Sequence, residues 1–505
     1  MFWKKTKPKA IENQSDAGFD SPNKQQTFRW GRLDLPNSEG PNHIAAIGTT
    51  GSGKTSLIRL LQQSVLPNVG KGDCRALVYD AKQDALPILS SIVDPSLIVT
   101  LNPFDDRGAA WDLAKDLDEP RIMMEFAATI IAPTPNESQP FFTDGARHLL
   151  YGVLLSYYLS KFDYKFADVL RPLRDLDLLK SVIGRHRQTN HIGNCYFHDQ
   201  RMAANLMSTI QSKILFFEPI AACWERATRL VSIKEWAKSE YILVLGNSEV
   251  SRSAIDTINR CIFKRVSDVT LDMGESTSRR SWVFLDEAAD AGRLQGLVSL
   301  AKKGRSKGAC VVLAFQSISG LRDPQLYGQF GTDELLGQIG TRFIGRLECP
   351  ATAQYVSELI GEQDITTVST SYTSGKNSST TTNYQRQVKK AVLPSQLLDL
   401  PPCNVENGLT GFCIVRSVGT FKTHMDGQDL FEGQLIPPDP NVPAFILRDP
   451  MSQILEPWTP EQALAFGINL SEPLPPKPRK RRKKKPMDAV VADNAPIDPL
   501  KDLFE

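Results

Sequence analysis

The stretch Gly48-Thr49-Thr50-Gly51-Ser52-Gly53-Lys54-Thr55 decides the fold class of this chain. It matches the phosphate-loop pattern G-x-x-x-x-G-K-[ST] and lies between apolar runs at 44–47 and 57–61. Glycines let successive backbone N–H groups surround phosphate oxygens, the lysine adds a mobile positive charge, and the threonine offers a hydroxyl to Mg²⁺. A plain glycine-rich turn is disfavoured by the flanking strand and helix patterns. The sequence therefore predicts a site for ATP and Mg²⁺.

Apolar runs of strand length recur after this loop and predict a parallel α/β sheet, because helical patterns separate them. Between about 112 and 240 strand signals are few and helical spacing dominates, as at 145–160 and 202–217. The predicted strands are 75–80, 97–104, 241–245, 282–287 and 309–316. We therefore expect an α/β domain built from 28–112 and 241–435, and an all-α domain inserted at 113–240.

Three further segments are predicted from composition. Residues 366–383 contain twelve Ser or Thr in eighteen positions, which predicts a mobile polar loop. We expect a disordered segment at 1–27 and an extended or disordered tail at 436–505. That tail contains a basic block at 477–485, and 471–505 carry nine basic and six acidic residues, which leaves a net charge of −1 for the rest of the chain. The block is typical of an arm that contacts nucleic acid, an anionic membrane surface or an import receptor.

Polar residues that end two predicted strands are candidates for chemistry. Asp286 and Glu287 close one apolar run, where the first carboxylate can hold Mg²⁺ and the second can polarise the attacking water. Gln316 closes the next run, and its amide can orient the same water or sense the γ-phosphate. An acidic pair alone is often only a strand edge, but here it follows a phosphate loop.

Arg305 lies between these two strands, within Gly304-Arg305-Ser306-Lys307-Gly308. One interpretation is a solvated helix end, since cations are favoured near a helix C-terminus. The other is an arginine finger that reaches the nucleotide of a neighbouring subunit. Lys302 and Lys303 are likewise compatible with a channel lining or with a solvated helix face.

Composition limits the class of protein. The 505 residues are 41% hydrophobic, enough for more than one compact core, and the eight cysteines lack a C-x-x-C pair, which favours a reducing compartment. The longest apolar candidate for a membrane span, 148–159, is too short, and no signal peptide is evident. A zinc site at His186, His191, Cys195 and His198 is disfavoured because the spacing fits no familiar pattern. We expect a soluble, cytoplasmic protein.

The order of short motifs along the chain is more specific than any one of them. They are 48–55, Val78-Tyr79-Asp80-Ala81-Lys82, Leu101-Asn102-Pro103-Phe104, Phe142-Thr143-Asp144-Gly145-Ala146-Arg147, Phe284-Leu285-Asp286-Glu287, Gly292-Arg293-Leu294, 304–308, Phe315-Gln316-Ser317 and Leu359-Ile360-Gly361. In this order the chain resembles the coupling ATPases of type IV secretion and conjugation, which are hexameric RecA-like DNA translocases. The resemblance spans roughly residues 28–432.

The resemblance implies a RecA-like nucleotide domain interrupted by an all-α domain. It implies that Lys54 and Thr55 bind ATP and Mg²⁺, that Asp286 and Glu287 form the Walker B pair, that Gln316 is the sensor and that Arg305 is a finger acting in trans. The partners it implies are DNA, five further copies of the chain, a relaxase and the channel proteins of a type IV secretion system. The implied function is to pump DNA through the hexamer toward that channel.

One feature departs from the family pattern. Its members usually begin with transmembrane helices, and this sequence contains none. Three explanations are open: a soluble member, an anchor borrowed from another subunit, or peripheral attachment to the inner face of the cell membrane through the basic block at 477–485.

Other classes of nucleotide-binding protein fit less well. An ABC transporter would carry a Leu-Ser-Gly-Gly-Gln-type signature, which is absent from the sequence, and small nucleotide kinases are shorter chains. The alternative that shares the fold is an ATP-gated hexameric receptor, which recruits a relaxase–DNA complex or protein cargo and has little motor activity. A motor requires fast hydrolysis stimulated by DNA, whereas a receptor tolerates slow turnover.

Overall fold

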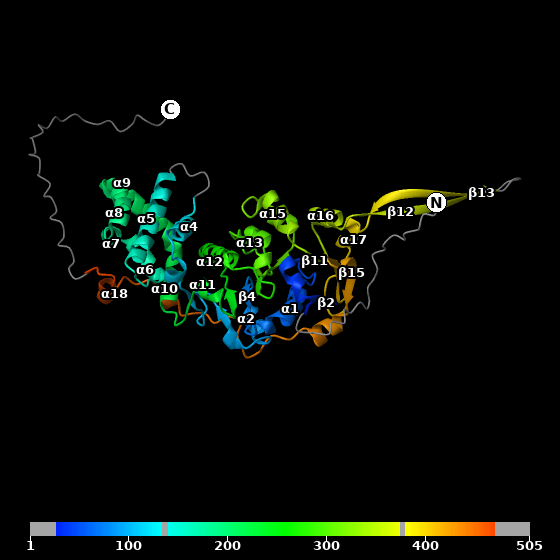
Figure 1. Ribbon diagram of the computed structural model, residues 1–505, viewed down its shortest axis with the longest axis horizontal. Coiled ribbons are helices and arrows are strands. Elements are labelled where there is room, and N and C mark those ends of the chain that lie inside the picture. Colours follow the sequence, from blue (N-terminus) through cyan, green and yellow to red (C-terminus); the bar gives the residue numbers. More distant parts are fainter. Residues whose placement is uncertain (1–26, 134–139, 374–378, 470–505) are drawn as a thin grey trace, which may run out of the picture. The chain divides into compact units, whose positions relative to one another are not determined.

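The structure is a computed structural model that describes residues 27–133, 140–373 and 379–469 (Figure 1). These residues fall into two compact units that divide after Trp458. The segment predicted at 1–27 lies, except for Thr27, outside the described residues, as does the basic block at 477–485.

A nine-stranded sheet forms the centre of the first unit within the described residues. Its strands are, in spatial order, β15 (Gly419–Met425), β14 (Leu409–Val415), β11 (Thr341–Ile344), β3 (Ile44–Ile47), β10 (Ala309–Phe315), β9 (Arg280–Leu285), β4 (Cys74–Tyr79), β8 (Ile242–Leu245) and β5 (Ile98–Thr100). From β11 to β5 all neighbours pair in parallel, and β14 and β15 are antiparallel. The predicted α/β class with a parallel-rich sheet is confirmed.

The central strands are apolar without alternation because both faces of the sheet are covered. Every residue of β3 and of β10 is buried. On one face, Trp282 and Phe284 of β9 stack at a centroid distance of 5.9 Å and share a core with Leu57 and Leu61. The helices of this part are α1 (Lys54–Val65), α2 (Ala85–Ser90), α12 (Arg252–Asp272), α13 (Leu297–Lys303), α14 (Ile318–Leu321), α15 (Gly328–Gly337), α16 (Pro350–Ile360) and α17 (Pro394–Leu398).

A short hairpin, β1 (Thr27–Trp30) and β2 (Leu33–Pro36), precedes the sheet and packs against α1. Phe28 of this hairpin meets the edge of the Trp282 ring at a centroid distance of 5.9 Å. The backbone N–H of Arg29 donates to Ser64 Oγ on α1 at 3.0 Å. The hairpin therefore closes the apolar core from the side of α1.

The described residues of the segment predicted as a helical insertion lie mostly in helices. They are α3 (Leu113–Asp116), α4 (Pro120–Ile130), α5 (Pro140–Leu159), α6 (Phe166–Leu170), α7 (Leu176–Ile183), α8 (Arg187–Phe197), α9 (Gln200–Ile214), α10 (Glu218–Glu225) and α11 (Ile233–Trp236). Helix α5 packs against α4, α7, α8 and α9 and so forms their common core. None of the helices in the described residues is long and apolar enough to cross a membrane.

The insertion leaves and rejoins the sheet through a two-residue parallel ladder of β6 (Ala110–Trp111) and β7 (Leu230–Val231). We call this ladder and its surroundings the neck, and the buried carboxylate of Asp116 holds it together. It accepts hydrogen bonds from Trp111 Nε1 at 2.6 Å, from Ser232 Oγ at 2.8 Å and from the N–H of Ile233 at 2.6 Å. Burial raises the pKa of Asp116, and these donors oppose that shift.

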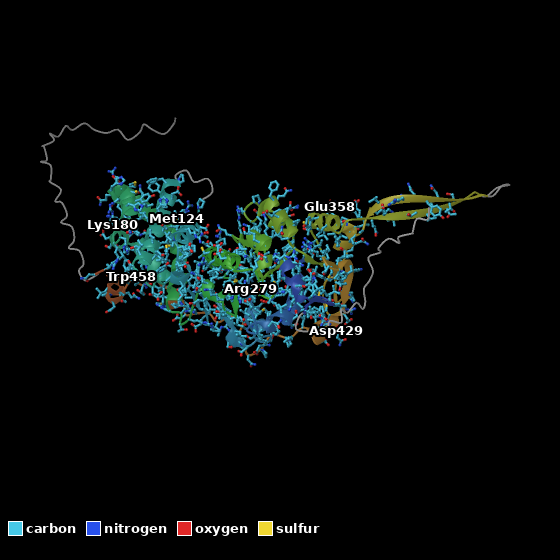
Figure 2. All side chains as sticks on the ribbon, viewed as in Figure 1. Met124, Lys180, Arg279, Glu358, Asp429 and Trp458 are labelled. Carbon is cyan, nitrogen blue, oxygen red and sulfur yellow. The ribbon has the colours of Figure 1, made fainter. Side chains whose placement is uncertain are left out.

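Residues 437–458, which we call the strap, connect the sheet region to the neck and the insertion. The sequence predicts an extended or disordered tail here, but the structure shows packed, extended chain interrupted by a short 3₁₀ turn at Pro450–Gln453. Arg448 of the strap is buried and donates to the carbonyl oxygens of Cys223 (3.0 Å), Asp105 (2.9 Å) and Gly108 (3.2 Å). Farther along, Trp458 Nε1 donates to Asp168 Oδ1 at 2.6 Å (Trp458 is labelled in Figure 2).

The prediction of an irregular loop at 366–383 is wrong for its described residues. They belong to a long antiparallel hairpin of β12 (Glu362–Thr373) and β13 (Ser379–Lys390), which Figure 1 shows in yellow. The β-branched threonines favour extended backbone, and pairing across the hairpin satisfies the backbone N–H and C=O groups. The described side chains of the hairpin are exposed or half-buried. A polar hairpin without a buried face shows no apolar alternation, so its composition resembles that of an irregular loop.

The described part of the second unit contains one short helix, α18 (Pro460–Ala465). Thr459 caps it: Thr459 Oγ1 accepts from the N–H of Gln462 at 3.3 Å, and Gln462 Oε1 accepts from the N–H of Thr459 at 2.9 Å.

Replacing Arg448 tests whether the strap supports the fold. We expect Arg448→Met to lower the free energy of unfolding by about 2–4 kcal/mol, because several buried carbonyl oxygens lose a charged donor. Urea denaturation followed by tryptophan fluorescence measures this. The matched control is Arg226→Met, which removes one exposed bond from the insertion to the Met451 carbonyl oxygen. Equal midpoints for the two variants would contradict a structural role for the strap.

Candidate functional site

The loop predicted to bind phosphates lies between the end of β3 and the start of α1. Gly51 has φ = 73° and Gly53 has φ = 90°, a region that favours glycine. A Cβ on Gly53 would lie 2.1 Å from Leu409 Cδ1 and 3.0 Å from Cys403 Sγ. The chain from β14 and the preceding loop therefore packs directly on the phosphate loop and fixes its backbone.

Hydrogen bonds hold the loop to its neighbours in the sheet. The N–H of Gly48 donates to the carbonyl oxygen of Phe315 at 3.2 Å, and the N–H of Thr49 donates to the carbonyl oxygen of Arg346 at 2.8 Å. The carbonyl oxygen of Gly51 accepts from the N–H of Cys403 at 2.8 Å. Strands β10 and β11, on either side of β3, thus position the start of the loop.

Lys54 lies inside the loop that it follows. Its Nζ donates to the carbonyl oxygens of Gly48 at 2.7 Å and Thr49 at 3.0 Å. Burial lowers the pKa of Lys54, and the carboxylates of Glu287 and Asp286 oppose the shift. The ammonium group is thus held at the concave side of the loop, where a phosphate-loop lysine has to be.

The structure brings Thr55 and Asp286 together. Thr55 Oγ1 donates to Asp286 Oδ2 at 3.0 Å, although 231 residues separate the two in sequence. Asp286 Oδ1 is buried and has no hydrogen-bond partner among the described residues. A buried carboxylate oxygen without a partner, beside a hydroxyl, is a fitting pair of hard oxygen ligands for Mg²⁺. The residues present therefore fit the metal that the sequence predicts.

Glu287 and Gln316 lie at the same edge of the sheet. Gln316 Nε2 approaches Glu287 Oε1 to 3.5 Å, at the outer limit of a hydrogen bond. Burial raises the pKa of Glu287, and the nearby Lys54 opposes that shift. A partly desolvated carboxylate next to an amide is suited to accept a proton from water and to orient it.

Arg305 does not lie in this site. It begins a 3₁₀ turn, Arg305–Lys307, that precedes β10, so it lies at the amino edge of the sheet. Strand β10 has seven residues, which separate the two edges by about 20 Å. The arginine is exposed and borders a cavity of about 570 Å³ with Arg280, Lys302 and Lys303. The structure therefore separates Arg305 from the phosphate loop of its own chain.

One site residue had no role in the sequence analysis. Lys82 follows β4, and its Nζ lies 3.8 Å from Asp286 Oδ2. Strand β4 pairs with β9, which places the end of β4 beside Asp286. The motif Asp80-Ala81-Lys82 was visible as part of the family resemblance, but only the strand order shows what it faces. Asp80 itself accepts from the N–H groups of Asp84 and Ala85, and burial raises its pKa to about 6.

The alternative metal cluster is not formed. Among the described residues there is no group of three or more His, Cys, Asp or Glu that could hold a metal ion. In that part of the insertion, His186 Nε2 lies 2.7 Å from Ser160 Oγ, which gives the ring a structural partner.

A family model described as the type IV secretion-system coupling protein DNA-binding domain matches residues 27–413. The chain belongs to this family. That membership confirms the resemblance drawn from the motifs. The chain is also similar to the coupling protein TraD of Escherichia coli strain K12, with 25% identity over 361 residues, which are 70% of this chain. The matched region is about half of TraD, 48% of its length.

Solved structures of the conjugative coupling protein TrwB share the fold. The unbound monoclinic form of TrwBdeltaN70 has a TM-score of 0.64, with 18% identity over 84% of this chain and 92% of that one. TrwB in complex with ADP and Mg²⁺ has a TM-score of 0.63, with 18% identity over the same shares of the two chains. At this identity the likeness concerns the fold, and this coupling-protein fold is therefore confirmed.

A methyl group on Gly53 should block the phosphate loop. We expect Gly53→Ala to weaken binding of a fluorescent ADP analogue by at least about tenfold, because the left-handed backbone and the contact with Leu409 both oppose a Cβ. The control is Gly337→Ala, at the end of α15, where a Cβ meets nothing within 4 Å. Fluorescence anisotropy measures both variants, and unchanged affinity in Gly53→Ala would contradict the assignment of the loop.

Proposed function

We propose that this coupling-protein family member binds ATP with Mg²⁺ at the carboxyl edge of its sheet and hydrolyses it. The observation that carries the proposal is the convergence of Lys54, Thr55, Asp286, Glu287 and Gln316, which come from three neighbouring strands of the sheet. TrwB structures in complex with ADP and Mg²⁺, and with non-hydrolysable analogues of ATP and GTP, support a nucleotide site in this fold.

Each side chain has a distinct task in this proposal. The amides of 48–55 and the ammonium of Lys54 bind and orient the phosphates. Thr55 and Asp286 hold Mg²⁺, which when bound offsets charge that develops on the phosphates. Glu287 accepts the proton of the attacking water, and Gln316 keeps that water in line with the terminal phosphate.

We further propose that hydrolysis drives movement of DNA. The DNA-binding description of the family supports contact with DNA, and the fold shared with conjugative coupling proteins supports delivery of a relaxase–DNA substrate to a type IV secretion channel. The basic block at 477–485, outside the described residues, is a second candidate contact for DNA or for anionic lipid at the inner membrane face.

The position of Arg305 supports a head-to-tail assembly of copies, which we propose is a ring of six. An arginine finger has to touch the terminal phosphate, and Arg305 lies at the edge of the sheet opposite to the loop of its own chain. A head-to-tail ring joins two different surfaces of neighbouring copies, and we propose that the amino edge of one copy meets the carboxyl edge of the next. Arg305 of one copy would then complete the site of its neighbour.

Steady-state hydrolysis with and without DNA tests the motor function. We expect single- or double-stranded DNA to stimulate ATP hydrolysis, and Glu287→Gln to lower the stimulated rate by about 10²–10⁴-fold with nucleotide binding retained. Glu358→Gln, at an exposed position of α16 labelled in Figure 2, is the matched control. Turnover that is slow and indifferent to DNA would overturn the motor proposal in favour of the ATP-gated receptor.

Mixing two inactive variants tests whether Arg305 acts in trans. We expect Arg305→Ala and Lys54→Ala each to lose at least about 10³-fold in hydrolysis. Assemblies formed from equal amounts should regain activity, because about a quarter of the contacts then join an intact loop to an intact Arg305. Recovery at no mixing ratio would show that Arg305 does not act across a subunit contact.

A further inference from the structure

Lys82 is the charged side chain nearest to the candidate metal ligands that has no place in the mechanism above. Its Nζ lies 3.8 Å from Asp286 Oδ2, the same oxygen that accepts from Thr55 Oγ1 at 3.0 Å. The side chain of Lys82 is 49% exposed and that of Asp286 is 25% exposed. The ammonium group is therefore free to move, whereas the carboxylate is fixed in the site.

Lys82 also lines a small cavity that opens on these ligands. The cavity lies between α1, α2 and the end of β4, and Thr55, Asp80, Asp84 and Asp286 are among its other polar residues. Lys82 and Arg59 are the cations among the lining residues, and of the two Lys82 is the one paired with Asp286. Lys54, the other lysine of the site, is bound instead to the loop carbonyl oxygens.

We propose that Lys82 is a positioning residue that acts as the counter-ion of Asp286 in the nucleotide-free protein and competes with Mg²⁺ for that carboxylate. A divalent cation between Thr55 and Asp286 would meet the positive charge of Lys82, and like charges at this distance repel. The negative charge of the nucleotide phosphates compensates for that repulsion. Lys82 therefore makes Mg²⁺ binding depend on prior or simultaneous binding of nucleotide. This inference rests on the nucleotide site proposed above.

Linkage gives the inference a measurable form. If Lys82 weakens the metal in the free protein more than in the nucleotide complex, it increases the factor by which nucleotide tightens the metal. By reciprocity it increases the factor by which the metal tightens nucleotide by the same amount. Removing the charge should lower both factors together, whereas a residue that only stabilises the fold changes neither.

The first experiment titrates Mn²⁺, as a spectroscopic probe for the Mg²⁺ site, into the nucleotide-free full-length protein and follows free Mn²⁺ by electron paramagnetic resonance. We expect Lys82→Met to bind one Mn²⁺ about 1.5- to 5-fold more tightly than the wild type, the range for a partly exposed ion pair. Lys82→Arg should resemble the wild type because it keeps the charge. Lys71→Met, at an exposed turn, is the matched control and should also be unchanged.

Asp286→Asn distinguishes this site from adventitious metal binding. In the double variant Lys82→Met/Asp286→Asn, the gain in Mn²⁺ affinity seen in Lys82→Met should disappear. The second measurement is the affinity for a fluorescent ADP analogue with Mg²⁺ and with EDTA. We expect the ratio of the two affinities to be smaller in Lys82→Met than in the wild type by about 1.5- to 5-fold, because linkage ties this change to the change in metal affinity.

The outcomes distinguish this inference from the nucleotide site itself. If the wild type binds nucleotide with Mg²⁺ but Lys82→Met leaves Mn²⁺ affinity and the affinity ratio unchanged, the counter-ion role is wrong and the nucleotide site stands. If the wild type binds no nucleotide, the proposed function fails first and the role of Lys82 falls with it. A gain in Mn²⁺ affinity that persists without the Asp286 carboxylate would also overturn the inference.

Discussion

Parallel pairing of β9, β10 and β3 is the constraint on which the rest of the site depends. Ile47 is in register with Phe315, and Leu313 with Leu285, so these strands end within about two residues of one another. Whatever follows each strand must then emerge at the same edge of the sheet. The phosphate loop, the acidic pair and Gln316 meet there, although more than 260 positions separate Thr55 from Gln316 in sequence.

Charge balance at this edge bears on the proposed contribution of Arg305 from a neighbouring copy. Lys54 and Lys82 lie near Asp286 and Glu287, so in the nucleotide-free protein these lysines are partly balanced by carboxylates. A nucleotide complexed with Mg²⁺ is still negatively charged. The loop amides supply only partial positive charge, and Arg305 lies at the opposite edge. In the proposed ring, Arg305 of a neighbouring copy would supply further positive charge.

Much of this site could be predicted from the sequence because each part is local. The loop is defined by residue types at fixed spacing, and Asp286 and Gln316 each end an apolar run of strand length. Lys82 could not be given a role in the same way. Its partner depends on β4 lying next to β9, and strand order is set by packing of the whole sheet, with no signal in the motif itself. The resemblance could single out Arg305, but only the direction of β10 shows that Arg305 lies at the edge of the sheet opposite to the phosphate loop.

The two largest differences from expectation also have physical reasons. None of the described side chains of the β12–β13 hairpin is buried, and its sequence lacks the apolar alternation by which strands are recognised. The strap at 437–458 is held mainly by side chains that donate to backbone carbonyl oxygens, as Arg448 does, and such contacts leave no periodic pattern. Sequence patterns report burial, and both segments are fixed by hydrogen bonding.

A structure determined with a non-hydrolysable ATP analogue and Mg²⁺ tests the account most directly. In that structure we expect the phosphates to lie against residues 48–55, Mg²⁺ to be bound by Thr55 and Asp286, and Lys82 to be no longer paired with Asp286. Nucleotide bound elsewhere, or a phosphate loop that stays empty at saturating analogue, would contradict the account.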